Sequence, residues 1–222
     1  MAVLAAVAFI GFVGNRKLLP VLAVFLLTWQ LIVPNAVKER VFMTENSNGE
    51  LEPSAGDRVT IWENAMEIIK GNPVIGTGFD TYKFMHAVGP YEDTHNYYVK
   101  VMLETGIVGM MIFLAIVSQM FRAGFALYRN PQADEFLRGV GLGVAALLVA
   151  AIVGNFFGDR WSYIEETGFT WVFVAMALRG TMLTQEQAAI AEAPESDALA
   201  LPLAYMERSA KSSMGPAPTT SR

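Results

Sequence analysis

Apolar residues in this chain gather into five runs, at about residues 1–13, 18–34, 97–121, 139–157 and 167–183. A helix needs about 20 apolar residues to cross the hydrocarbon core of a bilayer, so runs of this kind predict membrane-spanning helices. The fifth run is the weakest, because charged residues flank it at both ends. The pattern predicts an all-α integral membrane protein with about five transmembrane helices.

The first run lacks the basic leader and the small-residue cleavage site of a signal peptide, and it is short for a span. We interpret it as the tail of a span whose beginning is missing, in a fragment of a larger multi-span fold. Such a fragment is expected to be inactive alone. The expected divisions are two spans within residues 1–34, a loop over 35–95, three spans within 96–183 and a tail over 184–222.

Basic residues predict the orientation of this chain. Arg16 and Lys17 follow the first run, and three arginines lie in or beside the short loop between the third and fourth runs. Lys and Arg in short loops favour the cytoplasmic side, so the loop 35–95 is predicted to face outward. The tail from residue 184 is rich in Ala, Glu, Ser, Thr and Pro, which is typical of disorder.

The outward loop contains one amphipathic segment, predicted to be a helix over residues 57–70 and to stop at Gly71. Arg58, Trp62 and Ile69 share its apolar face. An arginine on that face has two interpretations. The commoner one is that Arg58 snorkels or pairs with a loop carboxylate. The other is an anion site, because guanidinium and the free N–H groups of a helix N-terminus both bind phosphate.

A polar cluster precedes the third run. Asp93 or Thr94 is predicted to cap the helix, which places His95 and Asn96 in its first turn at the membrane surface. Ionisable groups within an apolar run are costly and are usually paired or functional. Two such residues follow four positions apart: Lys100 and Glu104.

His95 also has two interpretations. An interfacial histidine that hydrogen-bonds the loop is the more frequent case. A general base is the better functional hypothesis, because neutral imidazole accepts protons near neutral pH. The only other histidine is His86 and no HxxxH pair exists, which leaves only a weak mixed metal site with Glu92 and Asp93.

Composition excludes several classes of protein. Apolar residues make up 53% of the chain and charged residues 17%, against about 25% charged in soluble domains, which excludes a soluble globular enzyme. The net charge of −5 and the lack of a basic stripe exclude nucleic-acid binding. Without cysteine there is no disulfide or thiolate chemistry. Gly76 and Gly78 lack the context of a P-loop and are interpreted as turn formers.

Two motifs in this order resemble the O-antigen ligase and polymerase superfamily of bacterial envelope glycosyltransferases, which includes the O-oligosaccharyltransferases. The resemblance covers residues 18–180. The pattern Arg-x-x-x-Trp followed by Asn-Pro-x-x-Gly-x-Gly is matched at Arg58, Trp62, Asn72, Pro73, Gly76 and Gly78. The pattern His-Asn followed by Glu-x-Gly-Ile-x-Gly is matched at His95, Asn96, Glu104, Gly106, Ile107 and Gly109.

The resemblance implies transfer of a glycan from a polyprenyl-pyrophosphate carrier to an acceptor hydroxyl of a glycan, lipid or protein. The reaction takes place at the outer face of the bacterial inner membrane, without a nucleotide sugar, a cofactor or an essential metal. His95 is then the catalytic base, and Arg58 binds pyrophosphate, with Arg40 as a second candidate. Supporting roles fall on Asn96, Glu104 and Trp62.

A noncatalytic alternative remains, in which the outer loop of a membrane module binds a polysaccharide or a partner protein. Geometry discriminates the two hypotheses. Catalysis requires Arg58 and His95 to face a common cavity, whereas binding allows them to lie far apart.

Overall fold

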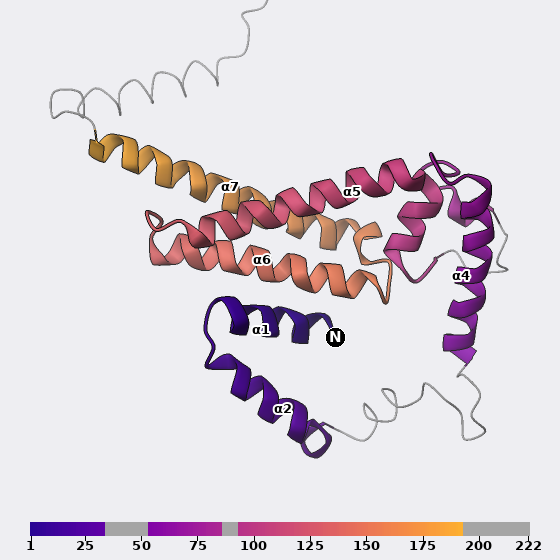
Figure 1. Ribbon diagram of the computed structural model, residues 1–222, viewed down its shortest axis with the longest axis horizontal. Coiled ribbons are helices and arrows are strands. Elements are labelled where there is room, and N and C mark those ends of the chain that lie inside the picture. The colour runs from indigo at the N-terminus through magenta and orange to yellow at the C-terminus, as the bar shows by residue number, and fades with distance from the viewer. Residues whose placement is uncertain (34–52, 86–92, 193–222) are drawn as a thin grey trace, which may run out of the picture.

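The computed structural model describes residues 1–33, 53–85 and 93–192, and the described part is helical without strands (Figure 1). An all-α protein was predicted, and the structure confirms this. Within these residues, six α-helices and two 3-10 helices follow one another: α1 (Ala2–Val13), α2 (Leu18–Ile32), α4 (Pro53–Gly71), η1 (Tyr82–Phe84), α5 (Tyr97–Arg129), α6 (Glu135–Asn155), η2 (Arg160–Ser162) and α7 (Ile164–Glu192).

Two of the described helices, α5 and α6, are long and apolar enough to cross a membrane. Helices α1 and α2 are apolar but shorter, and α7 does not reach the same hydropathy over a full span. The predicted number of five spans therefore stays a prediction. Helix α7 continues to Glu192, past the position where the tail was expected to begin, and residues 193–222 lie outside the described part.

Helices α5, α6 and α7 lie side by side, and α1 lies along α6 (Figure 1). A buried apolar cluster fills the space between them, with Leu127 and Leu148 fully enclosed. Small residues bring the backbones together, because a Cβ atom at Gly141 would lie within 3.0 Å of the α5 backbone. This bundle forms the base on which the N-terminal end of α5 is held.

Helix α5 is broken at Gly106, whose φ of 62° and ψ of −166° are not helical. Figure 1 shows a short first segment that bends away from the long remainder of α5. A break in a helix frees backbone N–H and C=O groups, which need other partners. Residues 73–78 supply them through four hydrogen bonds: Ile107 N to Pro73 O, 2.9 Å; Val108 N to Val74 O, 3.2 Å; Thr77 N to Leu103 O, 3.0 Å; and Gly78 N to Glu104 O, 2.9 Å.

Glycine is required on both sides of this junction. A Cβ atom at Gly76 would lie within 3.0 Å of the Glu104 carbonyl, and one at Gly106 would lie within 3.0 Å of the Val74 carbonyl. Both glycines also have positive φ. Gly76 and Gly106, one from each sequence motif, therefore belong to a single contact between two backbone segments. Each glycine packs against the segment that contains the other.

Helix α4 packs against the first segment of α5. Its buried residues Ile61, Ala65 and Ile69 form a small core with Tyr82 and Leu103. The helix begins at Pro53, four residues before the predicted start, because proline suits the first helical turn, where no N–H donor is needed. It ends at Gly71. This packing places the apolar face of α4 beside the residues that lead into α5.

Candidate functional site

The cap of α5 differs from the prediction. Asn96 is the N-cap, and its Oδ1 atom accepts hydrogen bonds from the N–H groups of Tyr98 (3.0 Å) and Val99 (3.3 Å). The expectation that Asp93 or Thr94 caps the helix was wrong, as was the placement of His95 in its first turn. Thr94 instead donates its hydroxyl to the Asn96 carbonyl at 2.8 Å.

His95 precedes the helix in a left-handed backbone conformation, with φ of 53°. Its N–H donates to Asp93 Oδ1 at 2.7 Å, and its Nδ1 lies 3.6 Å from Asp93 Oδ2. The Asp93 carboxylate therefore lies beside the imidazole, at a distance longer than a hydrogen bond. The His95 side chain is 40% exposed, so a substrate hydroxyl can reach it.

Asp93 was considered only as a cap or a metal ligand, and its contact with the imidazole is new. Burial raises the pKa of the Asp93 carboxyl, and the charge of Asp159 acts in the same direction, whereas the hydrogen bond from His95 lowers it. The signal for this contact in the sequence was the spacing of an Asx turn, Asp93-Thr94-His95. That spacing lets an aspartate bond the N–H two residues ahead.

Trp62 connects α4 to the His95 segment. Its indole Nε1 donates to the Thr94 carbonyl at 2.9 Å, immediately before His95. Arg58 lies one turn earlier on the same helical face, about 6 Å along the axis from Trp62, and is half-buried. Within the described ranges no hydrogen bond or ion pair joins the Arg58 side chain to another residue, His95 included.

The other candidate residues fall in different places. Glu104 is only 4% exposed and accepts a hydrogen bond from the Tyr82 N–H at 3.4 Å, so it joins η1 to α5. Arg40 lies outside the described residues. Tyr82 was not singled out from the sequence, and its buried hydroxyl has no hydrogen-bond partner in the part of the chain that the structure describes.

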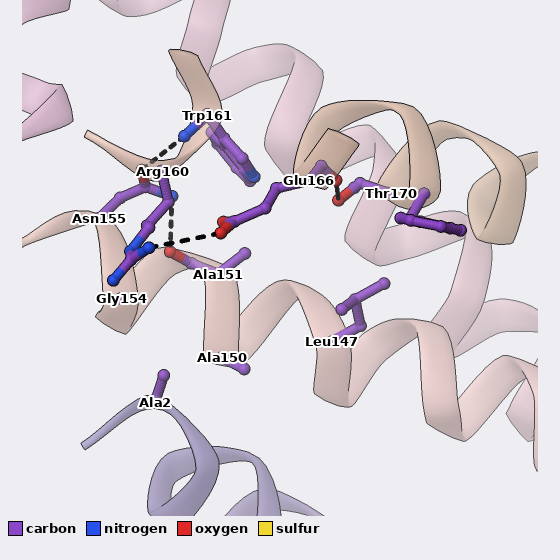
Figure 2. A pocket seen from close by; sticks show the side chains of 11 residues that line it. Ala2, Leu147, Ala150, Ala151, Gly154, Asn155, Arg160, Trp161, Glu166 and Thr170 are labelled. Atoms are coloured by element: carbon purple, nitrogen blue, oxygen red, sulfur yellow. Dashed lines mark hydrogen bonds and ion pairs between the residues drawn. The ribbon is translucent and has the colours of Figure 1, made fainter. Parts of the chain in front are cut away.

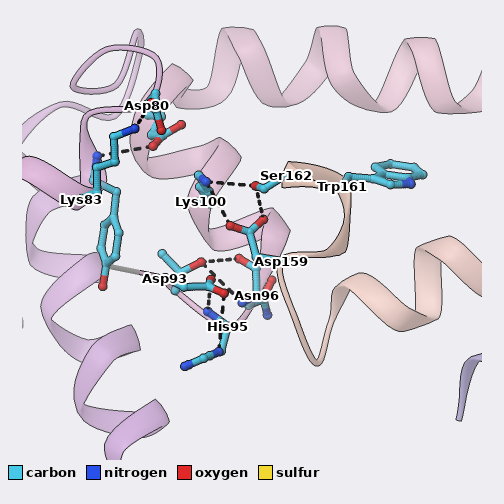
Figure 3. A network of polar contacts seen from close by, with 12 residues as sticks. Asp80, Lys83, Asp93, His95, Asn96, Lys100, Asp159, Trp161 and Ser162 are labelled. Atoms are coloured by element: carbon cyan, nitrogen blue, oxygen red, sulfur yellow. Dashed lines mark hydrogen bonds and ion pairs between the residues drawn. The ribbon is translucent and has the colours of Figure 1, made fainter. Parts of the chain in front are cut away.

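Lys100 pairs with Asp159 rather than with Glu104. Its Nζ lies 3.0 Å from Asp159 Oδ2 and donates to Ser162 Oγ at 3.0 Å, and Ser162 in turn donates to Asp159 Oδ1 at 2.7 Å. Figure 3 shows this cluster and the Asp93–His95 pair in one polar network at the start of α5. Asp159 was missed because nothing local in the sequence reveals a contact across 59 residues.

A cavity of about 540 Å³ opens beside Lys100 and runs along α5. Neither His95 nor Arg58 lines it. Polar, aromatic and aliphatic side chains all contribute to its lining. Its lining consists of Phe79, Asp80, Tyr97, Lys100, Val101, Glu104, Thr105, Gly109, Ile112, Phe113, Ile116, Trp161 and Ser162.

A second cavity, of about 380 Å³, lies between α6, η2 and the start of α7. Figure 2 shows Arg160 and Glu166 pointing toward each other across it, with their charged atoms 3.6 Å apart. Small and apolar residues such as Ala150, Ala151 and Leu147 form much of the remaining wall. Because its two charged groups neutralise each other, this cavity is not a strong candidate for catalysis.

No group of three His, Cys, Asp or Glu side chains suited to a metal ion occurs within residues 1–33, 53–85 and 93–192. The mixed metal site considered from the sequence joined His95 to Glu92 and Asp93, and Glu92 lies outside the described residues. The N–H group of His95 donates a hydrogen bond to Asp93.

A family model described as O-antigen ligase matches residues 1–114, slightly more than half of the chain. The matched region includes Arg58, Trp62, His95 and Glu104, and it confirms the resemblance drawn from the two motifs, although it ends before residue 180. Searches of curated proteins and of solved structures give no match to this chain.

Proposed function

The chain belongs to the O-antigen ligase family, and from this premise we propose that it transfers a glycan from a polyprenyl-pyrophosphate carrier to an acceptor hydroxyl. The proposal places the reaction at the outer face of the bacterial inner membrane. One observation carries it: the hydrogen bond from Trp62 to the Thr94 carbonyl, which holds the arginine-bearing face of α4 next to the Asp93–His95 pair. The common cavity that the catalytic hypothesis requires stays a prediction, since neither Arg58 nor His95 lines the two cavities described above.

The proposed chemistry assigns a proton and a leaving group to separate residues. The acceptor oxygen attacks the anomeric carbon of the glycan while His95 Nε2 takes up the hydroxyl proton. The bond from that carbon to the pyrophosphate oxygen breaks, and the carrier pyrophosphate leaves with the electron pair. Arg58 binds the pyrophosphate and stabilises its growing charge, and Asp93 positions the imidazole.

The role of Arg58 is tested by a substitution that keeps its charge. Lysine keeps the positive charge but lacks the planar guanidinium group, which can bind two phosphate oxygens at once. We expect Arg58→Lys to be nearly as damaging as Arg58→Ala, with a KM for the lipid-linked donor raised by about tenfold to a hundredfold, since hydrogen bonds to charged groups contribute about 1.5–3 kcal/mol. Donor titrations in a transfer assay measure this.

The matched control is Lys70→Ala, which removes a positive charge from the last turn of the same helix. Lys70 is exposed, and its ion-pair partner among the described residues is Glu67 on its own helix, at 2.6 Å. We expect the control to leave the KM for the donor unchanged. Near-normal kinetics in Arg58→Lys would point to a nonspecific positive charge and would contradict pyrophosphate binding through the planar guanidinium group.

The proposed mechanism needs no metal ion, because Arg58 takes the role that a divalent cation has in many enzymes acting on phosphates. We therefore expect transfer by the purified full-length protein to proceed at an unchanged rate after EDTA treatment. The measurement compares initial rates of transfer before and after chelation. Mg²⁺ or Mn²⁺ is then added back to the treated protein, and the rate is measured again. Loss of activity that either ion restores would overturn the role assigned to Arg58.

A further inference from the structure

An exposed apolar segment follows α4 and includes η1, in the part of the chain predicted to be an outer loop. Ile75 and Phe79 are 74% and 87% exposed, and Phe84 is 71% exposed. We propose that residues 74–84 insert into the lipid leaflet at the N-terminal end of α5, where these three side chains contact acyl chains. The inference goes beyond the proposed function, because it concerns membrane contact and holds whether or not the chain transfers a glycan.

The 74–84 segment is held at the level of the break in α5. The four backbone hydrogen bonds described above join residues 73–78 to residues 103–108. Helix α5 is long and apolar enough to cross a membrane, and its uncharged stretch, 105–121, is shorter than the about 20 residues that a crossing needs. The crossing therefore uses the helix up to the break. A segment bonded to the break lies at the edge of the hydrocarbon rather than in water.

The lipid-facing surface of α5 continues onto this segment. Ile107 and Val108 come directly after the break and are exposed, as are Met111 and Ile112 one turn later. These side chains belong to the apolar span, where exposure means contact with lipid. Phe79 lines the same cavity as Ile112, which places the segment beside that surface. A continuous exposed apolar surface of this kind is typical of a membrane contact.

The polar groups of the turn bond within the protein. Irregular backbone near hydrocarbon is tolerated only where its N–H and C=O groups have protein partners. Besides the four bonds to α5, the Gly76 N–H donates to the Asn72 carbonyl at 3.1 Å. The Thr81 hydroxyl donates to the Gly78 carbonyl at 2.7 Å, and the hydroxyl oxygens of Thr77 and Thr81 lie 2.7 Å apart. The turn thereby directs its polar groups inward and leaves its large apolar side chains outside.

The two charged residues of the segment limit how deep it can lie. Asp80 pairs with Lys83 three positions later, so the pair carries no net charge. The Nζ atom of Lys83 lies 5.1 Å from the centroid of the Phe84 ring, and a lysine stem can reach the headgroups while the ring stays among acyl chains. Interfacial segments bury their apolar side chains about 5–10 Å into the boundary between headgroups and acyl chains. That depth suits all three exposed side chains.

Helix α4 provides the contrast. Figure 1 shows it running across the end of the bundle, beside the first segment of α5. Its apolar face is buried against that segment, and Glu63 and Glu67 are exposed on the opposite face. A helix of this kind turns charged side chains to water. The 74–84 segment instead exposes large apolar side chains next to a span, and a bilayer is the partner that fits them.

Spin labelling tests the depth of the segment. The chain has no cysteine, so a single introduced cysteine carries the only label. The full chain is reconstituted in nanodiscs of palmitoyl-oleoyl phosphatidylcholine, and collision rates are measured with O2, which concentrates in hydrocarbon, and with a water-soluble nickel chelate. We expect the ratio of O2 to nickel collisions to be about fivefold or more higher in Phe79→Cys than in Glu63→Cys, given the depth of an interfacial segment.

Two further positions complete the comparison. Leu114→Cys gives the value for hydrocarbon, because Leu114 is exposed within the uncharged part of α5. Ile75→Cys repeats the measurement at a second exposed residue of the segment, so the test does not depend on one substitution. We expect Ile75→Cys and Phe79→Cys to fall nearer to Leu114→Cys than to Glu63→Cys.

Two results would overturn the inference. A collision ratio at positions 75 and 79 equal to that of Glu63→Cys would place the segment in water. Low collision rates with both reagents at these positions would show that protein covers the segment, which would replace the bilayer with another part of the chain or a second copy.

Discussion

Replacing His95 with asparagine is expected to lower the rate of glycan transfer by about 10²–10⁴-fold, the usual contribution of a general base. Asparagine is the informative choice because it tolerates left-handed backbone, and His95 has a φ of 53°. Alanine in this left-handed conformation would destabilise the folded protein by about 1–2 kcal/mol. A loss of activity could then reflect either lost catalysis or a disturbed fold. Initial rates with a lipid-linked donor measure the effect.

Two further measurements make the result interpretable. The thermal unfolding temperature of His95→Asn should match that of the wild type, because the His95 side chain is 40% exposed and contributes little to packing. His95→Gly accommodates the same backbone conformation and should be equally inactive. Substantial turnover in both variants would exclude His95 as the general base.

Replacing Gly106 with alanine is expected to prevent the protein from accumulating in a folded form. The added Cβ would lie within 3.0 Å of the Val74 carbonyl, on a backbone conformation that is essentially restricted to glycine. The clash cannot be relieved by a side-chain movement, because the opposing atoms are backbone. A destabilisation above about 4 kcal/mol belongs to this class of change.

Gly143→Ala is the matched control for this prediction. It adds the same methyl group in α6, where the new carbon would meet nothing within 4 Å beyond its chain neighbours and the local backbone of its own helix. Alanine is favoured over glycine within a helix by about 1 kcal/mol, so the control should be neutral or more stable. Size-exclusion profiles and circular dichroism of detergent-extracted protein compare the two variants. A folded Gly106→Ala protein with a normal unfolding temperature would show that the junction can rearrange.

The sequence predicted the local features of this structure well. The stop of α4 at Gly71 could be foreseen because Gly-Asn-Pro ends a helix by local chemistry, and the apolar face with Trp62 and Ile69 follows from helical periodicity. The start at Pro53 was missed, since Asp57 is also a good cap. Local signals of similar strength compete at a helix start, and tertiary contacts decide between them.

The same limit explains the error at α5. Asp93, Thr94 and Asn96 are all good N-caps, and sequence alone does not rank them within one turn. The choice is made by contacts from distant elements. Trp62 holds the Thr94 carbonyl, and the Tyr97 N–H donates to the Gly158 carbonyl at 3.3 Å.

Contacts between distant backbones are the part that could not be foreseen. Gly76 was interpreted as a turn former from its neighbours, and its positive φ fits a turn. Its position against Glu104 and the facing position of Gly106 depend on bringing two segments together across about thirty residues. No periodicity or propensity carries that information, and the pairing of Lys100 with Asp159 is hidden for the same reason.

The break in α5 also bears on how deep its charged residues must lie in a membrane. Residues 107–129 after the break would form a helix about 35 Å long, but Arg122 and Arg129 are charged, and the uncharged residues 107–121 would span only about 22 Å of a hydrocarbon layer of roughly 30 Å. Part of the segment before Gly106 must then complete the crossing. Because the break turns this segment aside, Lys100 and Glu104 reach partners on other elements, Asp159 at 3.0 Å and the Tyr82 N–H at 3.4 Å, which lower the cost of placing ionisable groups near hydrocarbon.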